Sequence, residues 1–590
     1  MSERAEVATS TALRRVLVVA PALRRGLGVT VGLAALGTAI QLVVPVVVQQ
    51  IIDFELLAPS SVDVGGAMVR GGVALLAMGV AMYIRGLALV RLAVRTAEGL
   101  SQLRVKAFAH LHRLSVLHVE SERRGTLVAR VTSDIAAVQD FLDWGGVGML
   151  VGSAQVVLAL VAMAIYRWQL ALLVGASALV YAAMLVWFQR ILQRNHDRVR
   201  RSVGDSLAAM GEAISGMPTV RAYGAEKPAL SKIEGVLDTQ FRAEFRTMKL
   251  GAALFSSAEL FAGLITAGVI GAGIALGPPT GLSAGTLIAF LFLVNLLVDP
   301  IQNLVETLDQ AQSAASGIRR VLTVLDTPIE IPDPGDGGRP LPGGQLGLAF
   351  HGVSFSYPTG GDVLHDVTAT VPSGSRVAIV GETGSGKSTF AKLATRLLEP
   401  RTGSVTVGGI PINDVAFAEL RNRVAFVPQE GFLFDATIGD NVRYGKPGAT
   451  DRELNAAFLE LELDDWIASL PAGFDTEVGE RGNQLSAGER QLVALVRAWI
   501  AAPDVLVLDE ATSAVDPALE VRIRRAMERI TRGRTSITVA HRLSTAEASD
   551  EILVFDQGVL VERGTHAELV ARGRTYAGLH ADWIAGTAAV

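Results

Sequence analysis

The first half of the chain is dominated by long apolar runs, and six of them have the length of a membrane-spanning helix. Such a helix needs about 20 consecutive, mostly apolar residues. Four runs contain no charged side chain, one contains only Glu259, and one contains Arg85 and Arg91. Buried helices of a water-soluble domain do not produce six such runs in succession, so the pattern predicts an all-α six-helix transmembrane domain. The predicted spans are residues 27–52, 71–92, 144–165, 168–188, 250–276 and 282–298.

Basic residues flank these spans unevenly, and this predicts their orientation. Arginines precede the first span, and the long connections at 93–143 and 189–249 are rich in arginine and lysine. The alternate connections are short and poor in basic residues, with only Arg70 and Arg167. Because basic connections stay in the cytoplasm, we expect a multi-pass protein of the inner (plasma) membrane, with its N-terminus and its C-terminal half in the cytoplasm.

The two long connections keep a helical spacing of apolar residues with charges between them, as in RTAEGLSQLRVKAFAHLHRL and RVRRSVGDSLAAMGEAISGM. They are predicted to continue the spanning helices into the cytoplasm and to bend near residues 115–124 and 214–221. Pro45 predicts a kink in the first span.

Three of the charged residues within or at the end of predicted spans are candidates for a functional role. Arg85, Glu259 and Asp299 are costly at membrane depth unless they are paired or hydrated. Two interpretations stay open for each of them. It can line a substrate path, or it can serve the structure in an ion pair or at the membrane interface.

The composition changes sharply after the spans. Residues 326–346, DTPIEIPDPGDGGRPLPGGQL, are rich in proline and glycine, which is typical of a linker. We therefore expect a transmembrane domain with helical extensions over 1–325, a linker over 326–346 and an α/β domain over 347–590. The net charge of −5 disfavours a nucleic-acid partner. The absence of cysteine excludes disulfides, thiol catalysis and zinc–thiolate sites.

The strongest chemical signal in the second half is VAIVGETGSGKSTF. An apolar strand over 376–380 precedes Gly-x-x-x-x-Gly-Lys-Ser, and a helical run follows. In this context the pattern is a phosphate-binding loop, whose backbone N–H groups and helix N-terminus face phosphates. Lys387 is predicted to reach the outer phosphates of ATP, and Ser388 to bind Mg²⁺. The predicted nucleotide-binding residues here are Gly381, Glu382, Thr383, Gly384, Ser385, Gly386, Lys387, Ser388 and Thr389.

A second segment, DVLVLDEATSAVD, supplies acidic groups to the same site. The apolar strand over 505–508 delivers Asp509 to its carboxyl end, the edge at which open α/β sheets bind ligands. Asp509 is predicted to hold Mg²⁺ through water. Glu510 is placed to polarise an attacking water as a general base.

Taken together, these motifs resemble those of an ABC exporter half-transporter, in which six spanning helices precede one ATP-binding cassette of the α/β P-loop NTPase class. The resemblance covers nearly the whole chain. FSYP resembles the adenine-stacking loop, with Tyr357 under the base, and FVPQEGFLFDATIGDNV resembles the Q-loop, with Gln429 sensing Mg²⁺ and water. SAVD resembles the D-loop, which ends at Asp516, and TVAHRLS resembles the switch region, with His541 at the γ-phosphate. TEVGERG resembles the cassette loop that touches the bends of the membrane domain, and GTLVARVTSD and EAISGMPTVRAYGAE resemble the two cytoplasmic connections of an exporter.

LSAGE, residues 485–489, resembles the ABC signature LSGGQ. In that family the signature covers the ATP bound by the opposite cassette, so the resemblance implies a dimer with a second half-transporter. Ser486, Ala487, Gly488 and Glu489 are the residues implied to contact that ATP. Ala487 replaces the first glycine and could crowd the γ-phosphate. Glu489 replaces glutamine, and its charge could weaken binding.

These departures leave two assemblies open: a homodimer that tolerates them, and a heterodimer in which this chain is the catalytically better half. The resemblance implies ATP-driven export of a hydrophobic or amphipathic drug, lipid or peptide from a membrane that supplies lipid contacts. Import of a siderophore-like ligand by the same fold is the alternative within this class. A soluble ABC ATPase that acts on nucleic acid and a channel or receptor gated by ATP are disfavoured by the six spans and by Asp509, Glu510 and His541.

Overall fold

A computed structural model describes residues 15–16, 18–56, 63–122, 124–280, 283–358, 360–509, 516–540 and 542–588. The chain divides into two compact units. The first unit comprises Met1–Arg113 and Arg123–Thr327, and the second comprises Leu114–Glu122 and Pro328–Val590.

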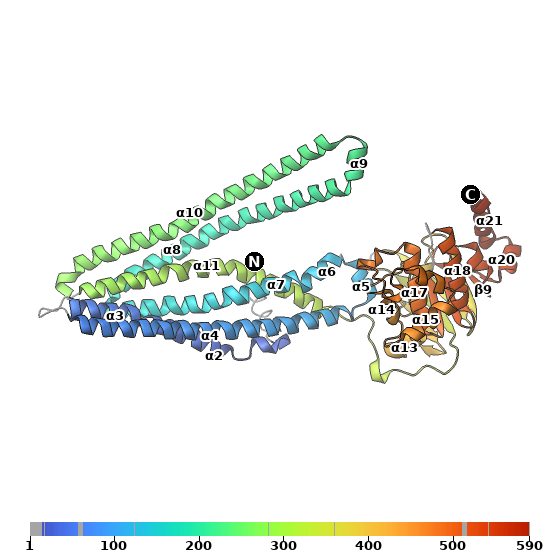
Figure 1. The fold of residues 1–590 in the computed structure, drawn as a ribbon, viewed down its shortest axis with the longest axis horizontal. Helices are drawn as coiled ribbons and strands as arrows, with labels where there is room; N and C mark the ends of the chain where they lie inside the picture. The colour runs from blue at the N-terminus through green and yellow to red at the C-terminus, as the bar shows by residue number, and fades with distance from the viewer. Residues whose placement is uncertain are drawn as a thin grey trace. The chain divides into compact units, whose positions relative to one another are not determined.

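In the part that the structure describes, the first unit contains helices with short connections and no strand (Figure 1). Five of its described helical stretches are long and apolar enough to cross a membrane: Pro21–Glu55, Val64–Leu111, Val151–Ser215, Glu226–Ala275 and Ala284–Asp326. The helices are α2 (Leu27–Gln41), α3 (Val43–Ile51), α4 (Val64–Leu111), α6 (Arg124–Val131), α7 (Ser133–Asp140), α8 (Val147–Ser215), α9 (Met217–Ala222), α10 (Glu226–Thr280) and α11 (Ala284–Asp326).

Helix α8 contains two of the six predicted spans, which accounts for five stretches instead of six. Its backbone leaves the helical region at Arg167, with φ −158° and ψ 106°. A Cβ built on Gly175 would lie 3.8 Å from Cδ2 of Leu160. Fifteen residues of straight helix would separate these positions by about 22 Å. The chain therefore turns back on itself at Arg167, and the third and fourth spans form a hairpin.

The predicted kink in the first span is confirmed. The span is divided at Leu42 into α2 and α3. Pro45 lies in the first turn of α3, where its missing N–H group and its ring oppose continuation of the preceding helix.

The spanning helices continue well beyond the apolar runs, as predicted. Helix α4 runs to Leu111, and α8 runs to Ser215. The bends predicted from the sequence are the short helices α5 (Val116–Ser121) and α9. Figure 1 shows α8 and α10 side by side, joined at one end by α9. Glu212 of α8 and Lys232 of α10 form an ion pair at 2.7 Å.

The second unit contains two sheets. The first is antiparallel with strand order β2-β1-β4-β5. The second has the order β10-β9-β3-β8-β7-β6 and is parallel except for the edge strand β10. The strands are β1 (Leu348–Ser356), β2 (Asp362–Val371), β3 (Arg376–Gly381), β4 (Thr402–Val407), β5 (Ile410–Pro411), β6 (Val424–Val427), β7 (Val505–Asp509), β8 (Thr535–Val539), β9 (Glu551–Asp556) and β10 (Val559–Gly564).

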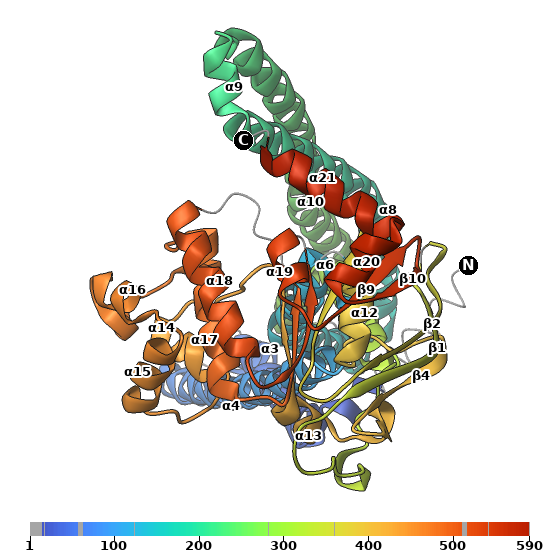
Figure 2. The same ribbon diagram turned by 90° about the vertical axis from the view of Figure 1, so that its right-hand side faces the viewer.

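Helices pack on these sheets in two groups. One apolar core joins both sheets to α12, and stacked rings of Phe350 and Phe390, 4.0 Å apart, lie within it. A second core is formed by the five helices from α14 through α18, which Figure 2 shows grouped together. The helices are α12 (Lys387–Ala394), α13 (Phe417–Arg423), α14 (Ile438–Arg443), α15 (Asp451–Glu460), α16 (Asp464–Ser469), α17 (Ala487–Ala501), α18 (Pro517–Thr531), α19 (Leu543–Glu547), α20 (His566–Arg572) and α21 (Thr575–Ala588).

Candidate nucleotide-binding site and membrane cavity

The predicted phosphate loop connects the fully buried core of β3 to α12. Gly381, with φ +152°, and Gly386, with φ +96°, have backbone conformations that side chains rarely adopt. A Cβ on Gly381 would also lie 2.1 Å from the carbonyl oxygen of Phe555, and one on Gly386 would lie 2.7 Å from Cδ2 of Leu364. The loop conformation therefore requires glycine at both positions.

Lys387 begins α12, and its side chain folds over the loop. Its ammonium group donates to the carbonyl oxygens of Gly381 at 2.8 Å and Glu382 at 2.6 Å. Burial lowers the pKa of Lys387 more than the carboxylates of Asp509 and Glu382 raise it. The ammonium group therefore lies at the loop, partly shielded from water. In that setting it can form strong, charge-assisted hydrogen bonds to phosphate oxygens.

Ser388 and Asp509 meet directly, although 121 positions separate them in the sequence. The Ser388 hydroxyl donates to Oδ1 of Asp509 at 3.3 Å. Asp509 ends β7, next but one to β3 in the sheet, and it is buried. A hydroxyl and a carboxylate oxygen side by side form a hard oxygen donor set that fits Mg²⁺.

Two more groups fit a nucleotide in this loop. The Ser385 hydroxyl is buried and has no hydrogen-bond partner among the described residues, so a polar ligand would satisfy it. The half-buried Tyr357 has its hydroxyl 3.1 Å from Oγ1 of Thr389 on α12. The proposed adenine-stacking ring is thereby attached to the phosphate-loop helix.

The remaining predicted residues follow the carboxyl ends of neighbouring parallel strands. Val427 of β6 pairs with Leu508 of β7, and Asp509 pairs with Val539 of β8. Gln429 is exposed just beyond β6, on the same edge of the sheet. Glu510 and His541, which directly follow β7 and closely follow β8, lie outside the described residues.

The signature segment forms the start of α17. Ser486 is its N-cap and is exposed, as is Ala487, whereas Gly488 is buried. Glu489 completes a capping box with Ser486. The second oxygen of its carboxylate accepts a hydrogen bond from Nε1 of Trp466 at 3.2 Å.

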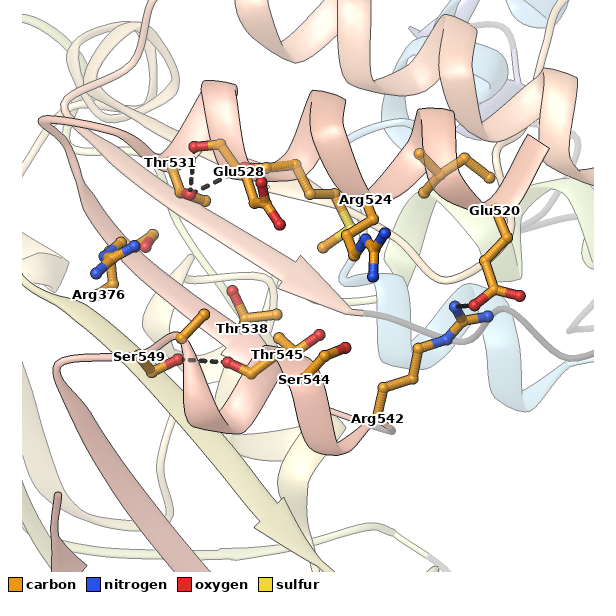
Figure 3. Close-up of a pocket in the computed structure, with 14 residues that line it drawn as sticks. Arg376, Glu520, Arg524, Glu528, Thr531, Thr538, Arg542, Ser544, Thr545 and Ser549 are labelled. Carbon is orange, nitrogen blue, oxygen red and sulfur yellow. Dashed lines mark hydrogen bonds and ion pairs between the residues drawn. The ribbon is translucent and has the colours of Figure 1, made fainter. Parts of the chain in front are cut away.

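Asp516, the predicted D-loop residue, is the N-cap of α18 and accepts a hydrogen bond from the backbone of Ala518 at 3.2 Å. A small cavity of about 70 Å³ lies between α18, β8 and α19 (Figure 3). At its edge Arg542, which follows the predicted switch histidine, forms an ion pair with Glu520 of α18. Its described lining contains none of the residues predicted to bind nucleotide, so this cavity lies outside the predicted site.

The first bend, α5, belongs to the second unit and contacts the phosphate-loop helix there. Glu120 forms an ion pair with Lys392 of α12 at 3.3 Å, and Leu117 packs on the apolar core beneath that helix. Ser115, the N-cap of α5, donates to Glu330 at 2.5 Å. A bend between spanning helices is thus attached to the helix that begins at Lys387.

The first unit contains a cavity of about 590 Å³. Its wall is largely small and apolar, with a few polar groups. The lining residues are Ala34, Gln41, Met78, Ala81, Met82, Arg85, Gly86, Ala88, Leu89, Asp143, Gly148, Val151, Gly152, Gln155, Pro300 and Asn303. Such a cavity can hold an amphipathic molecule.

Arg85 is the only positively charged residue of the described lining, and it donates to Oε1 of Gln41 at 3.2 Å. Its aliphatic stem lies on α2, because Gly37 has no side chain there. A Cβ on Gly37 would lie 2.7 Å from Cγ of Arg85. Glu259 and Asp299 are exposed and do not belong to the lining.

Sequence reasoning missed several residues of these sites. Gln41, Gln155 and Asn303 come from different helices and are uncharged, so no local pattern distinguishes them from other polar residues in spans. Trp466 also carries no local signal. The glycine at 37 could have been noticed only with the knowledge that Arg85 lies opposite it.

Comparison with known proteins finds relatives along most of the chain. The ABC transporter transmembrane region matches residues 27–301, and the ABC transporter family matches residues 364–513. The chain is 33% identical over 467 residues to an ATP-dependent lipid A-core flippase of Desulfotalea psychrophila, which covers 79% of this chain and 81% of the relative. It is 33% identical over 511 residues to a fatty acid ABC transporter ATP-binding/permease protein of Mycobacterium tuberculosis, with 85% and 80% covered.

A solved structure is similar over nearly the full length. It is the structure of a bacterial Atm1-family ABC exporter with ATP bound, which is 29% identical in sequence. The superposition has a TM-score of 0.78 and covers 95% of this chain and 98% of the exporter.

Proposed function

Since the chain belongs to the ABC transporters, we propose that it exports a hydrophobic or amphipathic substrate such as a drug, lipid or peptide. It is an exporter-type half-transporter, and its cassette binds and hydrolyses ATP to drive transport. It is a multi-pass membrane protein. We place it in the inner membrane, with its N-terminus and cassette in the cytoplasm, on the distribution of basic residues.

The loop from Gly381 to Thr389 binds the phosphates of ATP in this proposal, and Tyr357 stacks under the adenine. Lys387 turns its ammonium group from the loop carbonyls to phosphate oxygens. Ser388 and Asp509 hold Mg²⁺ with Gln429 nearby, and the ion would neutralise phosphate charge when bound. Glu510 orients and deprotonates the attacking water, and His541 contacts the γ-phosphate.

The signature segment serves the ATP of a second half-transporter. Ser486 and Ala487 are exposed at the start of α17, where free N–H groups and the helix dipole favour an anion. The Glu489 carboxylate accepts hydrogen bonds from Ser486 and Trp466, so its negative charge is stabilised by donors of its own chain. We therefore favour a homodimer with ATP at two composite sites.

Coupling runs through α5. Closure of two cassettes on ATP displaces α12, and the contacts of Glu120 and Leu117 transmit this displacement to the bend that follows α4. ATP then shifts the population toward an outward-open membrane domain to the extent that it binds the closed state more tightly.

The observation that carries the choice of cargo is the cavity around Arg85. Its small apolar wall suits acyl or other hydrophobic chains. Arg85 is the one cation of the described lining and Asp143 its one carboxylate, and the guanidinium group suits an anionic head group. The two relatives above are a lipid A-core flippase and a fatty acid transporter, which supports a lipid-like acidic cargo.

The test is directional transport by the purified chain in liposomes with outward-facing cassettes. Fluorescent anionic and zwitterionic lipids in the cassette-side leaflet report movement by their accessibility to a membrane-impermeant quencher. We expect Mg-ATP to move the anionic lipid away from the cassette side, and Glu510→Gln to abolish this. Movement toward the cassettes would indicate import. Hydrolysis without movement of any tested lipid, drug or peptide would refute the cargo class, and activity only with a companion chain would indicate a heterodimer.

A further inference from the structure

Three side chains outside the nucleotide site converge near the C-terminus of the second unit. Glu547 ends α19, His566 begins α20, and His580 lies on α21. Each offers one ligand atom, and the three atoms all lie within 4.8 Å of one another. Within the described residues, this is the one group of three histidine or acidic side chains with that arrangement.

The carboxylate lies between the two imidazoles. Oε1 of Glu547 is 3.8 Å from Nε2 of His566 and 3.9 Å from Nε2 of His580. In a tetrahedral zinc site with bonds of about 2.0–2.1 Å, ligand atoms lie roughly 3.4 Å apart. Small side-chain rotations would therefore bring all three atoms into the bonding range of one ion.

The surroundings already orient the histidine rings. Nδ1 of His566 lies 2.8 Å from the hydroxyl of Tyr576, and in the tautomer protonated at Nδ1 this contact leaves Nε2 free to bind a metal. Histidine ligands commonly use their second nitrogen in this way. Tyr576 is one helical turn before His580, and its backbone N–H donates to Glu562 at 2.8 Å, which anchors the start of α21.

We propose that Glu547, His566 and His580 form a transition-metal site, with Zn²⁺ as its ion, that ties α21 to α19. Two imidazoles, one carboxylate and an open position for water form a zinc donor set, whereas Mg²⁺ and Ca²⁺ prefer oxygen ligands. The three side chains are 44%, 29% and 18% exposed, so the ion can enter from solvent. The site is separate from the proposed transport function and does not depend on it.

The experiment uses the full-length transporter in detergent after treatment with a chelator. Isothermal titration with Zn²⁺ measures affinity and stoichiometry, and thermal unfolding with and without Zn²⁺ measures the linked stabilisation. We expect one saturable ion per chain and a raised Tm. Glu547→Gln and His580→Ala should each weaken binding at least about tenfold and remove the Tm shift. Tyr576→Phe should weaken binding by about tenfold without abolishing it.

His351→Ala is the matched control, because His351 is an exposed histidine on β1 of the same unit. It should bind Zn²⁺ like the unmodified chain. Glu547→Gln changes an exposed side chain, so its result does not depend on tolerance of a buried substitution. Zinc binding equal in the unmodified chain, Glu547→Gln and His580→Ala would overturn the proposal. A Tm that changes with pH but not with micromolar Zn²⁺ would also overturn it, because the three side chains would then form a histidine–carboxylate ion pair.

Discussion

The indole of Trp466 donates a hydrogen bond from Nε1 to Oε1 of Glu489 at 3.2 Å, which joins α16 to the start of α17. The other carboxylate oxygen accepts from the backbone N–H and the hydroxyl of Ser486, both at 2.8 Å. Glutamine has one acceptor oxygen and cannot accept from both sides. The acidic residue in this signature is therefore a structural link between two helices, and it matches the donors around it.

This arrangement predicts a pH-dependent contribution to stability. Burial raises the pKa of Glu489, but hydrogen bonds from Ser486 and Trp466 outweigh it, so the pKa is lower than usual. A carboxyl with a lowered folded pKa stabilises the protein above its unfolded pKa, near 4.3, and this contribution is lost as the pH falls through the folded value. Glu489→Gln should cost about 0.5–1.5 kcal/mol at pH 7.

Thermal unfolding of the full-length chain between pH 7 and pH 3 checks this prediction. The Tm difference between the unmodified chain and Glu489→Gln should shrink as the pH falls. Glu234→Gln, a change at an exposed position of α10, should leave the pH profile unaltered. A constant Tm difference at every pH would contradict the prediction.

Lys387→Ala should lower ATP hydrolysis by on the order of 100-fold, because it removes the cation aimed at the phosphates. Lys387→Met should lower hydrolysis to the same extent. Methionine keeps most of the side-chain volume, so this result would assign the effect to the lost charge. Phosphate release by the reconstituted chain is the measurement. Lys446→Ala is the control, since Lys446 is an exposed lysine paired with Glu453 at 2.5 Å. Hydrolysis within twofold of normal in Lys387→Met would contradict the proposed role.

Ser388→Ala should raise the Mg²⁺ concentration needed for half-maximal hydrolysis by about tenfold, because one of two oxygen donors is lost. Asp509→Asn should reduce the maximal rate as well. A titration of phosphate release against Mg²⁺ at constant ATP distinguishes the two effects. Thr395→Ala, on the same chain segment but beyond the end of α12, should leave the Mg²⁺ dependence unchanged. An unaltered Mg²⁺ titration in Ser388→Ala would remove that hydroxyl from the proposed site.

Much of the fold follows from local sequence. The prediction of a helical transmembrane domain followed by an α/β ATP-binding cassette is confirmed by the family matches and the similar exporter structure. The long uncharged runs predict helices without ambiguity, because a single segment in lipid can satisfy its backbone hydrogen bonds only as a helix. The helix extents beyond the membrane and the two bends were also predictable, because the apolar spacing persists through the connections.

What the sequence could not provide depends on contacts between distant residues. The partner of Glu489 is 23 positions upstream, so the sequence suggested only an extra charge, whereas the structure provides three donors. The few polar groups of the cavity are isolated residues that come from several helices. Of three charged residues in or beside spans, only Arg85 lines it. The roles of Glu510 and His541 stay predictions.

Gly37 positions Arg85 without touching the cargo. Because a Cβ there would lie 2.7 Å from Cγ of Arg85 and 3.2 Å from the carbonyl oxygen of Ala81, Gly37→Ala must displace the arginine stem. The guanidinium group would then lose Gln41 and move within the cavity. We expect Arg85→Ala to reduce export of the anionic lipid about tenfold, Gly37→Ala to have an intermediate effect, and basal ATP hydrolysis to persist in both.

Two controls separate this role from a general effect on packing. Gly32→Ala lies on the same helix, and its added methyl group would meet nothing within 4 Å, so transport should be normal. Arg85→Lys keeps the charge but loses the planar, two-pronged donor geometry, so it should retain part of the preference for anionic over zwitterionic lipid. If Arg85→Ala reduced transport of both lipids equally, the arginine would support the helix packing and would not select the head group. Normal transport by Gly37→Ala would show that α2 can move away from Arg85 and accommodate the added methyl group without displacing the guanidinium group.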